Sequence, residues 1–347
     1  MRVAAGEDLT SAESAAPPRP PVAALGRVDH ETLTDAVSDA TGKFGLSSWS
    51  WGEGVCLLGL LRAAEARGLP PPEPVLDFLT TAQVRLDHVN NLAPAAAAAR
   101  AAQATGRDDL RRIVTDCLAW FTAANLTRAP NGALEHWPGG VWADTVFMAG
   151  SFLLHTGRLL NRDDLIAEAV RQWLAHAEVL QHPGGLFAHG SHRGETIWCF
   201  WGRANAWVAL AGADLLELTG DPELRDRLHR QLRALAQCQP EHGVWDVLVD
   251  GQPENRGILE TSAAAGIGAA MLRAGRCLPD PELHSAGALA VRGALAYLDH
   301  GMLTRVSAGT VLQLVPFGYS VIRDDRPQPW GQGLALHALA AAIECDP

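Results

Sequence analysis

A repeated combination of turn and apolar helix is the feature that most restricts how this chain can fold. Six segments each join a Gly- or Pro-rich turn to aromatic or polar residues and then to a strongly apolar helical run. They recur at intervals of roughly forty to seventy residues, as structural repeats do. The six segments are residues 47–61, 85–98, 139–154, 196–211, 257–272 and 327–342.

Helices richer in Arg, Asp and Glu lie between these segments, for example at residues 109–121 and 221–236. A helix that is apolar all round belongs inside a protein, and a helix with one apolar face belongs outside. The alternation therefore predicts stacked helical hairpins, and six hairpins closed in a ring form an all-α (α/α)6 barrel. An open helical solenoid is the alternative. Two stretches, 243–251 and 300–315, could form short strands or hairpins.

The chain divides into residues 1–28, which we expect to be a flexible tail, and residues 29–347, which we expect to be one catalytic domain. The first residues are rich in Ala, Ser, Glu and Pro and have no apolar core of a secretory signal. No apolar run is long enough to span a bilayer, and the formal charge of −11 argues against nucleic acid as a partner. We expect a cytoplasmic monomer or homodimer.

Cysteines and histidines give no sign of a metal site. None of the six cysteines belongs to a CxxC pair, which favours small buried hydrophobic residues in a reducing compartment over disulfides or zinc ligands. His182, His189 and His192 share a Gly-rich turn without a carboxylate at ligand spacing. We therefore expect neither a metal nor another cofactor.

Two carboxylates stand where apolar helices begin. Asp144 lies between Trp142 and Phe147, at the end of a Gly-Gly turn, and Asp87 opens the segment at 85–98. A carboxylate among apolar groups is costly unless it is paired or used. Two carboxylates at one end of a helical ring suit acid/base work on a glycosidic bond. Helix capping is the alternative for both residues.

A third stretch, residues 184–207, gathers aromatic and basic side chains. Arg203 and Trp207 are four residues apart and share one helix face. Arginine can bind a carboxylate with two parallel hydrogen bonds, and an indole can stack on a sugar ring. The stretch therefore suits an acidic sugar, although most of the eleven tryptophans must belong to the core.

These segments resemble a known family. GGVWADTVFMAG, FAHG and WGRANAW, in this order, resemble the unsaturated glycuronyl hydrolases, above all the unsaturated rhamnogalacturonyl hydrolases of glycoside hydrolase families 105 and 88. QPEHGVWDVLVD, LETSAAAG, VSAGT and WGQGLALHALA extend the resemblance from about residue 49 to the end of the chain. The resemblance implies an (α/α)6 barrel and an oligosaccharide substrate that carries a 4,5-unsaturated uronic acid.

The resemblance also implies a role for each matching residue. Asp144 would protonate the double bond and then act as the base for water, with apolar neighbours keeping it protonated until then. Asp87 would orient water or stabilise charge. The positions that match substrate-binding residues of the family are Trp51, His136, His189, Arg203 and Trp207. We add Trp201 to these residues only because it lies next to them in the sequence, and not because it matches a family position.

Some residues depart from the family pattern. Thr145 follows the catalytic Asp where an acidic residue or Gly is common, and Ala204 replaces a Gly after Arg203. The loop between His136 and Asp144 is short. These changes leave open an unusual uronide as substrate, and other activities on the same fold: an inverting glycosidase, a sugar epimerase, a terpenoid cyclase or a sugar-binding protein without catalysis.

Overall fold

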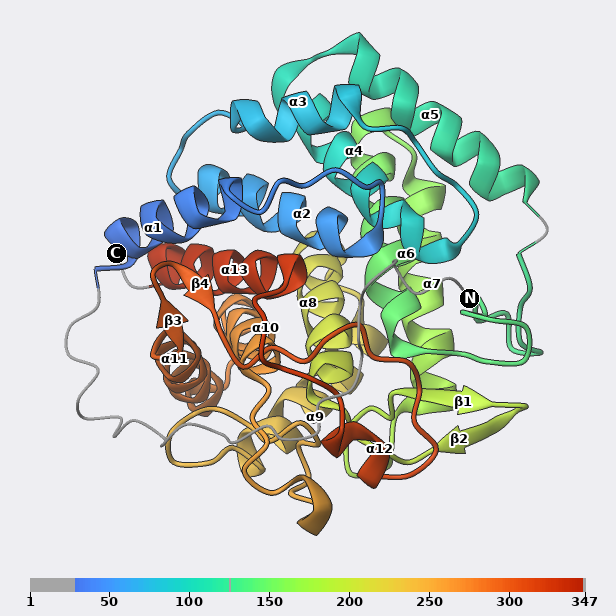
Figure 1. Ribbon diagram of the computed structural model, residues 1–347. Coiled ribbons are helices and arrows are strands. Elements are labelled where there is room, and N and C mark those ends of the chain that lie inside the picture. Colours follow the sequence, from blue (N-terminus) through green and yellow to red (C-terminus); the bar gives the residue numbers. More distant parts are fainter. Residues whose placement is uncertain (1–28, 125, 346–347) are drawn as a thin grey trace.

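Six inner helices form a closed ring in the computed structural model, which describes residues 29–124 and 126–345 (Figure 1). The inner helices are α2 (Trp51–Ala66), α4 (Ala93–Thr105), α6 (Ala143–Leu160), α8 (Gly202–Thr219), α10 (Thr261–Ala274) and α13 (Pro329–Cys345). Each inner helix packs against the next, and α13 packs against α2. This last contact closes the ring, which confirms the predicted barrel and excludes the open solenoid.

Six outer helices cover the ring. They are α3 (Glu73–Thr81), α5 (Asp108–Ala123), α7 (Asp163–Leu180), α9 (Pro222–Gln237), α11 (Pro281–Leu295) and α1 (His30–Gly42). Burial separates the two sets as the apolar pattern predicts. All fourteen residues of α10 are buried, whereas the buried residues of α9 form one stripe around Leu224, Leu228 and Leu235. The expected tail lies outside the described residues.

The ring closes between elements from opposite ends of the chain. α1 is the outer partner of α13, so the sixth hairpin combines the first and last helices. The backbones of α2 and α13 approach closely, because a Cβ atom on Gly59 would lie 2.4 Å from the carbonyl oxygen of Gly333. Any larger side chain at either glycine would therefore push the two helices apart.

Strands are short and lie in loops. β1 (Gly190–His192) pairs with β2 (Glu195–Ile197), and β3 (Leu298–Asp299) pairs with β4 (Met302–Leu303). The second hairpin overlaps the predicted stretch at 300–315. The stretch at 243–251 makes only isolated bridges, Asp246 to Leu259 and Leu248 to Trp201, because its neighbours are loop segments and not a strand. Two very short helices, η2 (Val89–Leu92) and η3 (Pro253–Asn255), and α12 (Phe317–Ser320) complete the loops.

The cysteines only partly follow the expectation. All six are free thiols, and Cys56, Cys117 and Cys199 are buried. Cys238 and Cys277 are exposed. Both come just after the end of a helix, so neither lies on a helix face that packs against the core. No helix within the described ranges has the length and apolarity needed to cross a membrane.

The two ends of the ring carry different kinds of side chains, with a network of ion pairs at one end and the predicted site residues at the other. Where the inner helices end, Arg62, Arg100 and Arg273 pair with Glu65, Asp214, Glu217 and Glu344. All of these except Glu344 line a cavity of about 280 Å³. Cations are favoured at helix C-termini, which is where these arginines lie. The predicted site residues lie at the opposite end, where the inner helices begin.

Buried histidines make the fold sensitive to acid. Burial lowers the pKa of His136, His155 and His337 to about 3 and that of His176 to about 4. Below about pH 6.5 the unfolded chain binds protons that the folded chain excludes, so stability falls as the pH falls through the range between these values and the ordinary histidine pKa. We expect each histidine to contribute about 1.4 kcal/mol per pH unit to this loss. Urea unfolding measured from about pH 8 to 5 tests it, and a flat profile would contradict it.

Candidate active site

Asp144 occupies the first turn of the inner helix α6, two residues after Trp142, the N-cap residue. The preceding loop turns at Gly139, whose φ of 83° favours glycine. An isolated bridge joins Trp142 to Gly190, and the amide of Ala143 donates to the carbonyl of His189 at 2.9 Å. The start of α6 and the segment before β1 are thereby fixed to one another, which places His189 beside Asp144.

The Asp144 carboxylate is buried, and its Oδ2 atom makes no hydrogen bond. It is 9% exposed, and its Oδ2 lies 3.3 Å from His189 Nε2. This is a charge contact between the two groups, and both atoms are buried without a hydrogen-bond partner. Burial raises the pKa of Asp144, but contact with His189 and the charges of His136 and Arg203 outweigh it, and the pKa lies below its ordinary value. The expectation that apolar neighbours keep this acid protonated in the free protein is therefore wrong.

Two histidines and a tryptophan form a wall around Asp144. The ring of His136 stacks on Trp142 with centroids 4.4 Å apart and planes at 9°. His136 Nδ1 lies 3.1 Å from Thr145 Oγ1, so the residue that departs from the family pattern orients this histidine. His189 packs edge-on against Trp142 and is fully buried.

Asp87 lies just before η2 and is half-exposed. Its Oδ1 accepts a hydrogen bond from Asn91 Nδ2 at 2.6 Å, and its Oδ2 accepts one from Arg85 Nε at 2.6 Å. The neighbouring His88 reaches the backbone carbonyl of His136 at 2.8 Å. Asp87 is thus linked to the wall around Asp144, with both of its oxygens already engaged.

Arg203 is fully buried inside the ring. Its Nη1 donates to the carbonyl of Ser307 at 2.7 Å and lies 3.3 Å from Glu260 Oε2, and its Nη2 donates to the carbonyl of Ala308 at 2.8 Å. The guanidinium also lies 4.4 Å from the ring centre of Trp201. Both terminal nitrogens are therefore occupied by the protein, which differs from the expected free fork for a substrate carboxylate.

The remaining predicted residues are aromatic. Trp207 is fully buried against Phe147, with ring centres 5.1 Å apart, and Trp201 is buried beside His189. Trp51 begins α2 and stacks on Trp330 at 4.4 Å. Of these aromatic residues, Trp51 is the partly exposed one.

Sequence reasoning missed three residues that contact this group. Trp330, from α13, places its ring centre 5.5 Å from the Arg203 guanidinium carbon. Glu260 precedes α10 and is the buried partner of Arg203, and burial raises its pKa despite that positive charge. Tyr319, from α12, places its hydroxyl 2.7 Å from His189 Nδ1. A carboxylate before an apolar helix was a usable signal for Glu260, as it was for Asp144.

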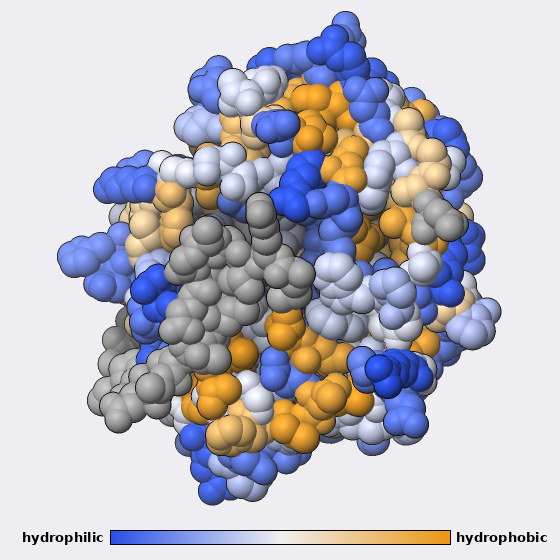
Figure 2. Space-filling model, turned by 45° about the vertical axis from the view of Figure 1, so that its right-hand side comes forward, coloured by the Kyte–Doolittle hydropathy of each residue, from blue (hydrophilic) through white to orange (hydrophobic). Residues whose placement is uncertain are grey.

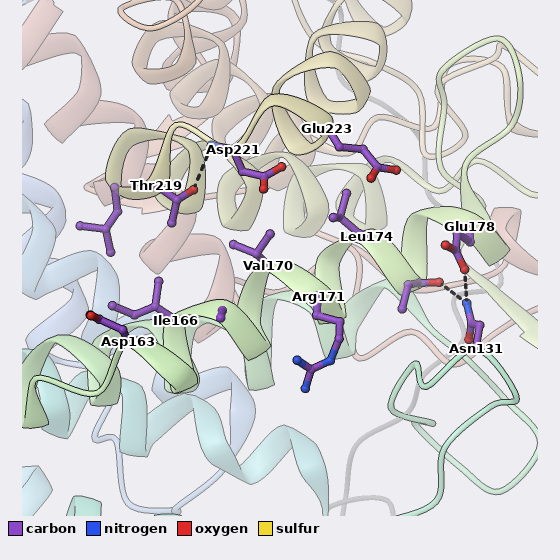
Figure 3. A pocket seen from close by; sticks show the side chains of 13 residues that line it. Asn131, Asp163, Ile166, Val170, Arg171, Leu174, Glu178, Thr219, Asp221 and Glu223 are labelled. Atoms are coloured by element: carbon purple, nitrogen blue, oxygen red, sulfur yellow. Dashed lines mark hydrogen bonds between the residues drawn. The ribbon is translucent and has the colours of Figure 1, made fainter.

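A groove on the outside of the barrel is lined by none of the predicted site residues. It has a volume of about 730 Å³ and lies along α7 and the turn into α9, with Ile166, Val170 and Leu174 on one side and charged groups around them (Figure 3). On the face shown in Figure 2, apolar surface forms patches separated by hydrophilic surface. Within residues 29–124 and 126–345, no group of three or more His, Cys, Asp or Glu side chains is arranged to hold a metal ion.

Comparison with known proteins decides the family. The model of Glycosyl Hydrolase Family 88 matches residues 28–345. The chain belongs to glycosyl hydrolase family 88. This family 88 chain is also 32% identical over 325 residues to the unsaturated rhamnogalacturonyl hydrolase YesR of Bacillus subtilis (strain 168), covering 86% of this chain and 90% of the relative.

Solved structures share the fold of this chain. A crystal structure described as a possible member of the GH105 family, from Salmonella enterica, matches with a TM-score of 0.80 and 26% identity, over 91% of this chain and 93% of that chain. The unsaturated glucuronyl hydrolase of Bacillus sp. GL1 matches with a TM-score of 0.67 and 19% identity, over 90% and 94% of the two chains. The resemblance predicted from the motifs is confirmed, and the protein is a glycosyl hydrolase.

Proposed function

We propose that this enzyme removes a 4,5-unsaturated uronic acid from the non-reducing end of oligosaccharides, with Asp144 as the proton donor. The observation that supports this most is the buried Asp144 carboxylate, whose Oδ2 has no hydrogen-bond partner and faces His189 at 3.3 Å. A carboxylate held in this way is free to exchange a proton with a substrate. The similarity to an unsaturated rhamnogalacturonyl hydrolase suggests the substrate class.

In the proposed reaction, Asp144 donates its proton to C4 of the enol ether. The electron pair of the double bond forms the new C4–H bond, and positive charge develops on C5 and the ring oxygen. The Asp144 carboxylate then accepts a proton from a water molecule that adds to C5. The resulting hemiketal opens to a C5 ketone, and the hemiacetal at C1 releases the rest of the oligosaccharide, so one water molecule is consumed.

Substrate binding would supply the protonated acid that this reaction needs. The pKa of Asp144 is lowered in the free protein by His189, His136 and Arg203, against the effect of burial. A uronate placed beside Asp144 brings a second negative charge, and like charges raise the pKa of a carboxyl group. We propose that Asp144 takes up its proton as the anionic sugar enters, while Asp87 stabilises the charge that develops on the ring.

A labelling experiment tests the proposed reaction. Unsaturated rhamnogalacturonyl and glucuronyl disaccharides, and their saturated counterparts, are incubated with the enzyme in deuterium oxide. We expect the absorbance of the conjugated double bond to disappear, one deuterium to enter C4, and the saturated sugars to remain intact. Cleavage of saturated sugars, or release of a uronate with its double bond retained, would instead indicate a conventional glycosidase.

A further inference from the structure

We propose that Tyr319 is a positioning residue, which fixes His189 as the tautomer with its proton on Nε2, facing Asp144. This inference rests on the proposed role of Asp144. Tyr319 lies in α12, and it is 130 residues further along the chain than His189. It is fully buried, whereas Leu314, Val315 and Phe317 of the same segment are more than half exposed. The segment therefore turns one aromatic side chain inward, onto the histidine.

The hydroxyl of Tyr319 has a defined set of neighbours. The backbone amide of Gln313 lies 3.4 Å from the oxygen and can only donate to it, and His189 Nδ1 lies 2.7 Å away. Burial, together with nearby negative charge, holds the pKa of Tyr319 well above its ordinary value, so the hydroxyl keeps its hydrogen. Among the hydrogen bonds of the described residues, His189 Nδ1 is the acceptor for that hydrogen.

The acceptor role of Nδ1 settles where the histidine carries its own proton. A neutral imidazole has one N–H and one acceptor nitrogen. If Nδ1 accepts from Tyr319, the N–H is on Nε2, 3.3 Å from Asp144 Oδ2. The opposite tautomer would place a lone pair of Nε2 against the carboxylate and leave the Tyr319 hydrogen without an acceptor. Both consequences are unfavourable in a buried site.

α12 is held in place by a contact with a second loop. Asn255, in η3, donates from Nδ2 to the carbonyl of Pro316 at 3.2 Å, and α12 packs on η3. Phe317 to Ser320 is therefore anchored independently of His189, as an orienting group should be. A second group that orients the imidazole is a common requirement where a histidine acts on a reacting residue.

The tautomer affects the acid on which the reaction depends. The positive end of an N–H on Nε2, 3.3 Å from Asp144 Oδ2, stabilises the charged form of the carboxyl group, which favours release of the proton to C4. If Tyr319 is removed, the other tautomer becomes available. Its Nε2 can accept a hydrogen bond from the protonated Asp144 carboxyl group, which then keeps its proton to a higher pH. The other titratable groups around this pair are His136, His88, Arg203, Cys199 and Glu260.

Nitrogen NMR of histidine-labelled enzyme tests the tautomer directly. The His189 signal is identified by its loss in His189→Gln. In the unsubstituted enzyme we expect an unprotonated Nδ1 and a protonated Nε2, and in Tyr319→Phe a mixture or a reversal. The chain has one other tyrosine, and Tyr297→Phe is a matched control that should leave the spectrum of His189 unchanged. A protonated Nδ1 in the unsubstituted enzyme would overturn the proposal.

The pH profile of activity provides the second measurement. With unsaturated disaccharides, we expect Tyr319→Phe to lower kcat about tenfold and to move the alkaline limb of kcat/KM upward by on the order of one pH unit. Tyr297→Phe should move neither. An unshifted limb in Tyr319→Phe would contradict the positioning role. The NMR spectrum reports the tautomer even if no uronide is turned over. Failure of the proposed function would therefore appear as absence of turnover, and failure of this proposal would appear in the spectrum.

Discussion

Asp144→Asn is expected to lower the kcat for loss of the unsaturated double bond by about 10³-fold. The amide has nearly the same shape as the carboxylate but cannot deliver a proton to C4 or accept one from water. Because Asp144 lies in the first turn of α6, the change also removes a favourable charge from the start of a helix, which has a small effect on stability. The absorbance assay measures turnover, and thermal unfolding measures stability.

Asp163→Asn is the matched control for this prediction. Asp163 lies in the first turn of α7 and is exposed, so the substitution repeats the helix-terminus effect without touching the site. We expect it to leave turnover unchanged. If Asp144→Asn kept more than about a tenth of the normal kcat, another group would have to donate the proton. Asp87, with both oxygens engaged, would then be the next residue to replace.

Arg203→Met is expected to destabilise the protein by about 3–5 kcal/mol, because it leaves a buried carboxylate without its cation. Arg203 and Glu260 are both completely buried, and Ser307 and Ser262 also donate to Glu260. The loss should be larger near about pH 8 than near about pH 5. Without Arg203 the raised pKa of Glu260 rises further, so the unpaired carboxyl group can take up a proton at the lower pH.

A double-mutant cycle separates this role from substrate binding. Replacing Glu260 by Gln in the Arg203→Met background should restore part of the lost stability, because no buried charge remains. Arg162→Met, which breaks the exposed pair with Asp164, should cost at most about 1 kcal/mol. If Arg203→Met left the free energy of unfolding unchanged and only raised KM, the arginine would be a uronate ligand, as the resemblance implies.

The periodicity of the chain was sufficient to predict the ring, because a helix that is buried on all sides carries apolar residues on every face. This pattern is visible in the local sequence. The helices α10 and α9 illustrate this, since one is mostly apolar and buried on all sides and the other is buried along one stripe. The position of Asp144 at the start of an inner helix was equally visible. The direction of its pKa shift was not, because it depends on His189 and Arg203, which reach Asp144 only through the fold.

Contacts made by loops escaped prediction for the same reason. Tyr319 is in a four-residue helix with no periodic pattern of its own, and its partner His189 lies in another loop. Arg203 looked like a free cation in the sequence because its acceptors are backbone carbonyls of Ser307 and Ala308. Backbone groups carry no residue-specific signal, so sequence alone cannot show that they occupy a side chain.

The contact between Gly59 and Gly333 also bears on which part of the site is assembled last as the chain folds. It joins the first inner helix to the last one, so it is among the most non-local contacts of the ring, and contacts between distant parts of a chain are slow to form in folding. During synthesis, the apolar face of α2 must wait for α13 to leave the ribosome, which makes the incomplete chain prone to aggregation. The stacked pair Trp51 and Trp330 spans this same seam. We therefore expect the aromatic side of the site to be assembled last, so that no part of the growing chain binds a sugar before the whole barrel exists.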